Sequence, residues 1–226
     1  MREIVFDTET TGLSFNGGDR MVEIGCIELI NRVPSGNHFH AYFNPERNMP
    51  AEAFAVHGLS DRFLSDKPLF ASRVEELLAF IGESPLIAHN ATFDFGFLNG
   101  ELGRCSRPIV ELHRMVDTLA IARKRHPGAK HSLDALCTRY GIDLSARELH
   151  GALLDAQLLA QVYIELTGGR QITLGLSQAE PAMRETIETP TRAQVRPARQ
   201  FGPSPAELER HAAFLKGMEE PLWNAG

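Results

Sequence analysis

The sequence predicts an α/β fold, in which helices flank a five-stranded mixed sheet, followed by a flexible linker and a short C-terminal helix. Three observations lead to this prediction. Apolar runs of β type follow one another closely up to Phe43, which favours an antiparallel meander. Helical and strand patterns then alternate as far as Thr167, which favours a mixed sheet covered by helices. Beyond Gly168, prolines become frequent and large apolar side chains become scarce.

Each expected strand is a short run of aliphatic, β-branched or aromatic residues with polar residues or turn formers at its ends. Residues 31–36 carry the turn signal between the second and third strands. The expected strands cover residues 4–6, 21–30, 38–43 and 86–89, and the fifth lies within 109–116.

Apolar side chains at helical spacing predict the helices. Val74, Leu77 and Ile81 share one face of such a pattern, and Gly82 ends it. The expected helices cover residues 72–81, 92–102, 118–125, 133–140 and 152–166.

The composition is that of a soluble globular protein, because 43% of the 226 residues are hydrophobic and 23% are charged. No apolar run reaches the roughly 18 residues of a membrane span, and the charged N-terminus is unlike a secretory signal. Cys26, Cys105 and Cys137 have no CxxC spacing, which argues against disulfides or a zinc site and predicts a cytoplasmic protein. With a net charge of −6, a role on nucleic acid would need bound metal or local cations.

The change of composition near residue 168 predicts three parts: a folded domain at 1–168, a linker at 169–203 and a helical tail at 204–226. The linker follows from its prolines and its few large apolar residues. The tail begins with a helix-start signal, in which Ser204 caps, Pro205 takes the first helical position and Glu207 completes a capping box.

Asp7 and Glu9 follow the first expected strand. Strand side chains alternate between two sides, so the two carboxylates point the same way at a spacing of about 7 Å. They repel each other unless a cation lies between them. Taken alone, such a pair is also typical of an ordinary polar strand end.

Two more acidic residues have unusual surroundings. Asp94 lies among phenylalanines one helical turn after the fourth expected strand, although a carboxylate also suits a helix N-terminus. Asp155 lies at the edge of a leucine stripe. Gly151 places His150 before that helix, from where the imidazole can swing toward Asp155. Alone, this pair also fits a surface histidine and a capping aspartate.

Together these residues favour metal-dependent phosphodiester chemistry. Four carboxylates at one end of a sheet suit hard divalent ions such as Mg²⁺ or Mn²⁺. Two such ions can clamp the attacking and leaving oxygens of a phosphodiester. A neutral histidine can take the proton from the attacking water.

Three segments resemble the motifs of the DEDDh 3′→5′ exonucleases: FDTETTGL at 6–13, HNATFDFGFL at 89–98 and HGALLDAQLLA at 150–160. The resemblance runs from about residue 4 to 167 and points to the proofreading epsilon subunits of bacterial DNA polymerase III. It implies an RNase H-like fold and removal of nucleotides from single-stranded or frayed 3′ DNA ends. By this resemblance two metal ions are held by Asp7, Glu9, Asp94 and Asp155, with Asp7 bridging them, and His150 is the general base.

The resemblance also assigns a pocket for the terminal nucleotide. The segment AFAVHGLSD at 53–61 is similar to the family's sequence around that pocket. The implied pocket residues are Thr10, Gly12, Leu13, Val56, His57 and Phe93.

The tail predicts partners. Residues 171–176 resemble the short peptides that bind a sliding clamp, with Gln171, Leu174 and Leu176 as contacts, although a short extension packed on the domain is the alternative. A short amphipathic helix is marginal alone, so a partner surface is expected to order the last segment. In the epsilon family that segment binds the polymerase alpha subunit, although folding back onto its own domain is the alternative. The predicted contacts are Leu208, Phe214, Leu215 and Trp223.

The sequence therefore favours a metal-dependent DNA proofreading exonuclease that releases nucleoside monophosphates. A related exonuclease that trims RNA 3′ ends is the second hypothesis, because the motifs do not separate the two. A catalytically inactive adaptor is the third, and the complete set of four acids and His150 argues against it.

Overall fold

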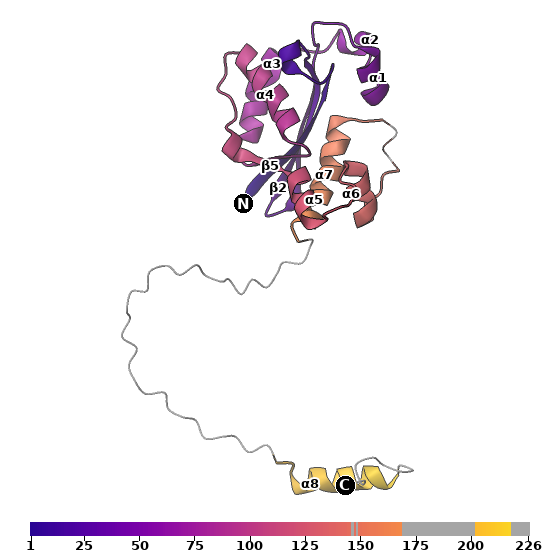
Figure 1. Ribbon diagram of the computed structural model, residues 1–226. Helices are drawn as coiled ribbons and strands as arrows, with labels where there is room; N and C mark the ends of the chain where they lie inside the picture. The colour runs from indigo at the N-terminus through magenta and orange to yellow at the C-terminus, as the bar shows by residue number, and fades with distance from the viewer. Residues whose placement is uncertain (146, 148, 169–201, 218–226) are drawn as a thin grey trace, which may run out of the picture. The chain divides into compact units, whose positions relative to one another are not determined.

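The computed structural model describes residues 1–145, 147, 149–168 and 202–217, which fall into two units (Figure 1). The first unit contains the sheet and seven α-helices, and the second contains one helix. The predicted clamp-binding peptide at 171–176 and Trp223 lie outside the described residues.

The sheet is mixed and has five strands, as predicted, and their order is β3-β2-β1-β4-β5. β1 pairs with β2, and β2 with β3, in antiparallel fashion, whereas β1–β4 and β4–β5 are parallel pairs. The strands are β1 (Arg2–Thr10), β2 (Met21–Ile30), β3 (Val33–Tyr42), β4 (Leu86–Ala88) and β5 (Met115–Asp117).

Two strands, β1 and β3, differ from the prediction by several residues, whereas β4 ends one residue earlier and β5 one residue later than expected. The turn after β2 is not the whole of 31–36 but only Asn31 and Arg32, both of which have positive φ, so β3 begins at Val33. Pro34 is tolerated there because β3 is an edge strand. β1 continues to Thr10, so Asp7 and Glu9 lie within the strand and not beyond it.

All five predicted helices are present: α3 (Phe70–Ile81), α4 (Thr92–Arg104), α5 (Thr118–Arg125), α6 (Leu133–Tyr140) and α7 (Ala152–Leu166). Two short helices were not predicted, α1 (Ala51–His57) and α2 (Asp61–Leu64). α1 leaves Phe54 and Val56 exposed, so it has no core-facing apolar stripe for a periodicity argument to detect.

Alternate residues of β1 serve opposite faces of the sheet. Ile4 and Phe6 belong to the core under α3 and α4, whereas Val5 belongs to the core under α7 (Figure 1). α5 and α6 pack on the outer side of α7 through a third apolar cluster. The sheet is therefore covered on both faces, and β1 contributes side chains to both.

Gly25 allows α7 to approach the sheet closely. A Cβ at this position would lie 2.4 Å from the Leu153 backbone at the start of α7. Gly25 is also the β2 partner of Asp7. The N-terminus of α7 is thus held directly beside Asp7.

The second unit contains α8 (Pro205–Lys216), which begins as predicted. The Ser204 side chain accepts from the Glu207 N–H, and the Glu207 carboxylate accepts from the Ser204 N–H, which completes the capping box. Leu208 and Phe214 are exposed on this helix. Among the described residues, no helix has the length and apolar character needed to span a membrane.

Candidate active site

The candidate site lies where β1 extends beyond the end of its parallel neighbour, β4. The β1–β4 pairing covers Ile4 and Val5 only, and β4 ends at Ala88. Asp7 and Glu9 come after this point, on the face that Val5 shares with α7. Two carboxylates therefore line one face where the parallel partner has ended.

Asp155 and His150 reach this face from the start of α7. Asp155 is buried in the first turn of the helix, whereas His150 precedes the helix and is exposed. His150 Nδ1 lies 3.2 Å from Asp155 Oδ2. One ligand atom each from Glu9, His150 and Asp155 fall within 4.8 Å of one another. The expectation that His150 lies before the helix and reaches Asp155 is confirmed.

Asp94 comes from the opposite face of the sheet. It is buried in the first turn of α4, and its Oδ1 accepts a hydrogen bond of 2.7 Å from the Thr8 hydroxyl. Thr8 alternates with Asp7 and Glu9 along β1, so the strand holds Asp94 with one face and presents two carboxylates on the other.

The acids repel one another strongly. Burial raises the pKa of Asp7 well above its ordinary value, and the charges of Asp94, Glu9 and Asp155 raise it further. Burial, followed by the Glu23 charge, raises the pKa of Glu9 to about 8. Burial also raises the pKa of Asp94 to about 7. These groups cannot all be ionised at neutral pH without a compensating cation.

Divalent metal fits this donor set. Asp7, Glu9, Asp94 and Asp155 offer only carboxylate oxygens, which Mg²⁺ and Mn²⁺ prefer. The raised pKa values show where positive charge is needed, and a bound divalent ion would supply it.

Two residues that touch this site were missed by sequence reasoning. Arg147 donates from Nε to Asp155 Oδ1 at 2.5 Å and from Nη2 to Asp155 Oδ2 at 2.7 Å. Glu23 is buried opposite Glu9 in the β1–β2 register and lies 2.7 Å from His40 Nε2. The contact of Arg147 depends on the path of the loop before α7, and that of Glu23 depends on the strand register, so neither has a local sequence signal.

Of the predicted pocket residues at the end of β1, Thr10 and Gly12 maintain the turn, whereas Leu13 is exposed to solvent. The Thr10 hydroxyl donates to the Gly12 carbonyl at 2.6 Å and so closes the turn. A Cβ on Gly12 would lie 2.4 Å from the Asp19 carboxylate, so a larger residue here would displace that side chain. Leu13 is 87% exposed and is free to contact a ligand.

Of the predicted pocket residues on α1 and α4, His57 is buried, whereas Val56 and Phe93 are partly exposed. His57 is buried, its Nδ1 accepts from the Leu59 N–H at 3.1 Å, and burial lowers its pKa. Val56 is half-exposed, and its carbonyl accepts from the His150 N–H at 3.2 Å. Phe93 is half-buried on α4, with its ring centroid 5.0 Å from that of Phe97. α1 is thus held beside the candidate base.

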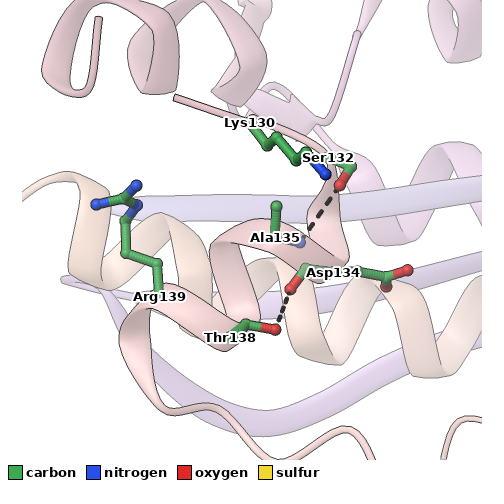
Figure 2. A pocket seen from close by; sticks show the side chains of 6 residues that line it. All are labelled: Lys130, Ser132, Asp134, Ala135, Thr138 and Arg139. Atoms are coloured by element: carbon green, nitrogen blue, oxygen red, sulfur yellow. Dashed lines mark hydrogen bonds between the residues drawn. The ribbon is translucent and has the colours of Figure 1, made fainter. Parts of the chain in front are cut away.

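A hollow of about 730 Å³ lies along α6 and the residues just before it (Figure 2). None of its lining residues is a predicted site residue. The hollow is lined by Lys130, Ser132, Asp134, Ala135, Thr138 and Arg139. Asp134 in this lining forms an ion pair with Arg147, which in turn pairs with Asp155.

Comparison with known proteins agrees with this geometry. A family model described as "Exonuclease" matches residues 4–163. The DNA polymerase III subunit epsilon of Rickettsia prowazekii is 48% identical, over 95% of this chain and 96% of that protein. The corresponding subunit of Escherichia coli is 42% identical, over 99% and 98%.

Solved structures share the fold. Exonuclease X in complex with 5′ overhanging duplex DNA has a TM-score of 0.55 at 27% identity, covering 73% of this chain and 90% of that one. The nuclease domain of 3′hExo, a DEDDh member bound to rAMP, has a TM-score of 0.63 at 14% identity, covering 74% and 91%. The chain therefore belongs to the exonuclease family that includes the DNA polymerase III epsilon subunits.

Proposed function

We propose that this chain is a divalent-metal-dependent 3′→5′ exonuclease that proofreads for the replicative DNA polymerase III and releases nucleoside monophosphates. The observation that carries the proposal is the convergence of buried acids on an exposed histidine at the end of β1. The full-length similarity to epsilon subunits supports the polymerase assignment.

Asp7, Glu9, Asp94 and Asp155 would hold the two Mg²⁺ or Mn²⁺ ions. When bound, such ions activate the attacking water and stabilise the leaving oxygen of the phosphodiester. The carboxylates' own part is to fix these charges in a buried place, since β1 and two helix starts leave them little freedom.

His150 acts as the general base. Its side chain is 49% exposed, so its imidazole can meet an incoming water and return the proton to solvent. The adjoining backbone is fixed, because the His150 N–H donates to the Val56 carbonyl.

The terminal nucleotide binds against exposed apolar side chains beside the acids. Leu13 and Val56 offer surface to the sugar and base, and Phe93 adds an aromatic edge. Thr10, Gly12 and His57 shape the turns that position these contacts.

The C-terminal part connects the nuclease to replication in the cytoplasm. α8 presents Leu208 and Phe214 to solvent, and with Leu215 and Trp223 they bind the polymerase alpha subunit. Deleting residues 204–226 should abolish co-elution with that subunit on gel filtration and leave hydrolysis of free single strands unchanged. A surviving complex would assign the contact to the first unit.

Residues 171–176 bind the sliding clamp through Gln171, Leu174 and Leu176. Replacing all three by alanine should remove clamp binding while short single strands are still hydrolysed normally. Equal clamp affinity for both proteins would refute the motif.

The activity is tested by comparing hydrolysis of matched DNA, mismatched DNA and RNA 3′ ends, each with Mg²⁺ and with EDTA. We expect metal-dependent release of nucleotides from DNA, fastest at the mismatch. A clear preference for RNA would favour the RNA-trimming alternative, and no hydrolysis of any substrate would favour the inactive adaptor.

A further inference from the structure

Arg147 is a nearly buried cation that contacts both carboxylate oxygens of Asp155. Its side chain is only 9% exposed, and it donates to both Asp155 oxygens, from Nε at 2.5 Å and from Nη2 at 2.7 Å. The hydrogen bond to Asp155, followed by the charges of Asp155, Asp134 and Asp7, raises the pKa of Arg147. Among the described residues, it is the one arginine or lysine that pairs with any of the four acids.

The same guanidinium also engages the candidate base. Arg147 Nη2 lies 2.9 Å from His150 Nδ1. The same Nη2 lies 3.4 Å from Nε2, and Nδ1 also lies 3.2 Å from Asp155 Oδ2. An arginine can only donate, so whichever ring nitrogen of a neutral imidazole lacks the proton has this donor within 3.4 Å. In this state neither ring nitrogen of His150 is free to accept a proton from water.

A divalent ion at Asp155 and this guanidinium compete for the same carboxylate. Both oxygens of the carboxylate already accept from Arg147. An ion on either oxygen would lie a few Å from a second positive charge in a buried place, where repulsion is strong. Metal binding at Asp155 therefore favours departure of the guanidinium.

Asp134 offers the guanidinium a second anchor. Arg147 Nη1 is paired with the exposed carboxylate of Asp134 on α6. That carboxylate projects from α6 away from Arg139, as Figure 2 shows. Arg147 can therefore release Asp155 and His150 while it keeps one ion pair on the rim of the site.

We propose that Arg147 is a latch, which neutralises Asp155 and blocks His150 in the metal-free protein and is displaced by the divalent ion that binds Asp155. Metal loading and release of the base are thereby one event. This inference rests on the metal site of the proposed function.

Metal affinity gives the first test. Free Mn²⁺ is counted by its electron paramagnetic resonance signal during titration of the full chain. Because Arg147→Gln removes the competing cation, it should bind Mn²⁺ about tenfold more tightly. Arg139→Gln is the matched control, since Arg139 is exposed on α6 and makes no ion pair among the described residues. It should bind within about twofold of wild type.

Tighter Mn²⁺ binding by Arg147→Gln would also be expected if Arg147 repelled the metal without moving. A measurement on the wild-type protein distinguishes displacement of Arg147 from repulsion by a fixed Arg147. The Nε–H nuclear magnetic resonance signal of Arg147, assigned by its absence in Arg147→Gln, should be protected from exchange without metal. It should shift and lose protection as Mg²⁺ saturates the site.

Three results decide the matter. An unchanged Nε–H signal at saturating Mg²⁺ overturns the latch, as does an Arg147→Gln protein that binds Mn²⁺ no more tightly than wild type. Asp155→Asn should weaken Mn²⁺ binding. If it does not, the metal site of the proposed function is itself wrong, which is a different failure from that of the latch.

Discussion

The two sides of the candidate site are built differently. On the strand side, Asp7 and Glu9 lie within a paired strand, and Asp94 is fixed by the Thr8 hydroxyl. On the loop side, His150 precedes a helix and is half-exposed, held by Arg147 and by one main-chain hydrogen bond. Under the proposed function, this difference divides two tasks: the buried, rigid acids position charge, and the more exposed segment that carries His150 transfers the proton.

Removing a strand-side carboxylate should have the largest effect. We expect Asp7→Asn to lower nuclease activity by at least roughly 10³-fold, because the proposed metal site would lose a carboxylate ligand. The metal-free protein should become more stable, since a buried charge repelled by Asp94, Glu9 and Asp155 disappears. Hydrolysis rates and urea unfolding in EDTA measure both. Asp66→Asn, at an exposed site, should change neither.

Substantial hydrolysis by Asp7→Asn in Mg²⁺ would refute the two-metal assignment. A metal-free Asp7→Asn protein that is less stable than wild type would show that the strand side is not under electrostatic strain.

On the loop side, His150→Ala should lower kcat by roughly 10²–10⁴-fold, the usual effect of losing a general base. Mn²⁺ affinity should change little, because His150 is not assigned as a ligand. His113→Ala is the control, since His113 is exposed beside Glu111. If His150→Ala instead loses the metal and keeps a normal kcat at saturating metal, His150 is a ligand and not the base.

The same contrast explains what the sequence could predict. The shared orientation of Asp7 and Glu9 was predictable from the alternation of side chains along one strand. Gly151 indicated that His150 precedes α7. The bidentate pairing of Arg147 with Asp155 depends on the path of a loop, and the place of Glu23 opposite Glu9 depends on strand register. Local periodicity contains neither, because both are set by tertiary packing.

Gly25 lies between Asp7 on the strand side and the start of α7 on the loop side, so Gly25→Ala should change the distance between the two sides. Its Cβ would meet Leu153 and Ala152 backbone atoms at 2.4–2.5 Å, which α7 can relieve only by moving. A shift of about 1 Å at Asp155 should reduce activity by roughly 10²-fold. Gly96→Ala on α4 is the control, because its Cβ meets nothing within 4 Å. Equal rates for the two variants would mean that the site tolerates this displacement.

The stability of the metal-free protein should fall at high pH because of the raised pKa values of Glu9 and Asp94. Burial raises the pKa of Glu9 to about 8 and that of Asp94 to about 7, so the folded chain holds protons that the unfolded chain releases. The free energy of unfolding in EDTA should therefore fall as pH rises from 7 to 9, by about 1–2 kcal/mol. Histidines with lowered pKa values titrate below this window. Saturating Mg²⁺ should remove the fall, and a flat EDTA profile in urea titrations would contradict it.

Thr8→Val should have the smallest effect of these changes. It tests whether a single hydrogen bond holds Asp94 in place. The substitution keeps the shape of the side chain but removes the 2.7 Å hydrogen bond to Asp94 Oδ1. With Asp94 less constrained, metal affinity and activity should each fall by about tenfold or less, as is usual for a group that orients a ligand. Thr8→Ser retains the hydroxyl and should stay near wild type in Mn²⁺ titrations and hydrolysis rates. If both variants lose activity equally, packing of the Thr8 methyl group, and not its hydrogen bond, fixes Asp94.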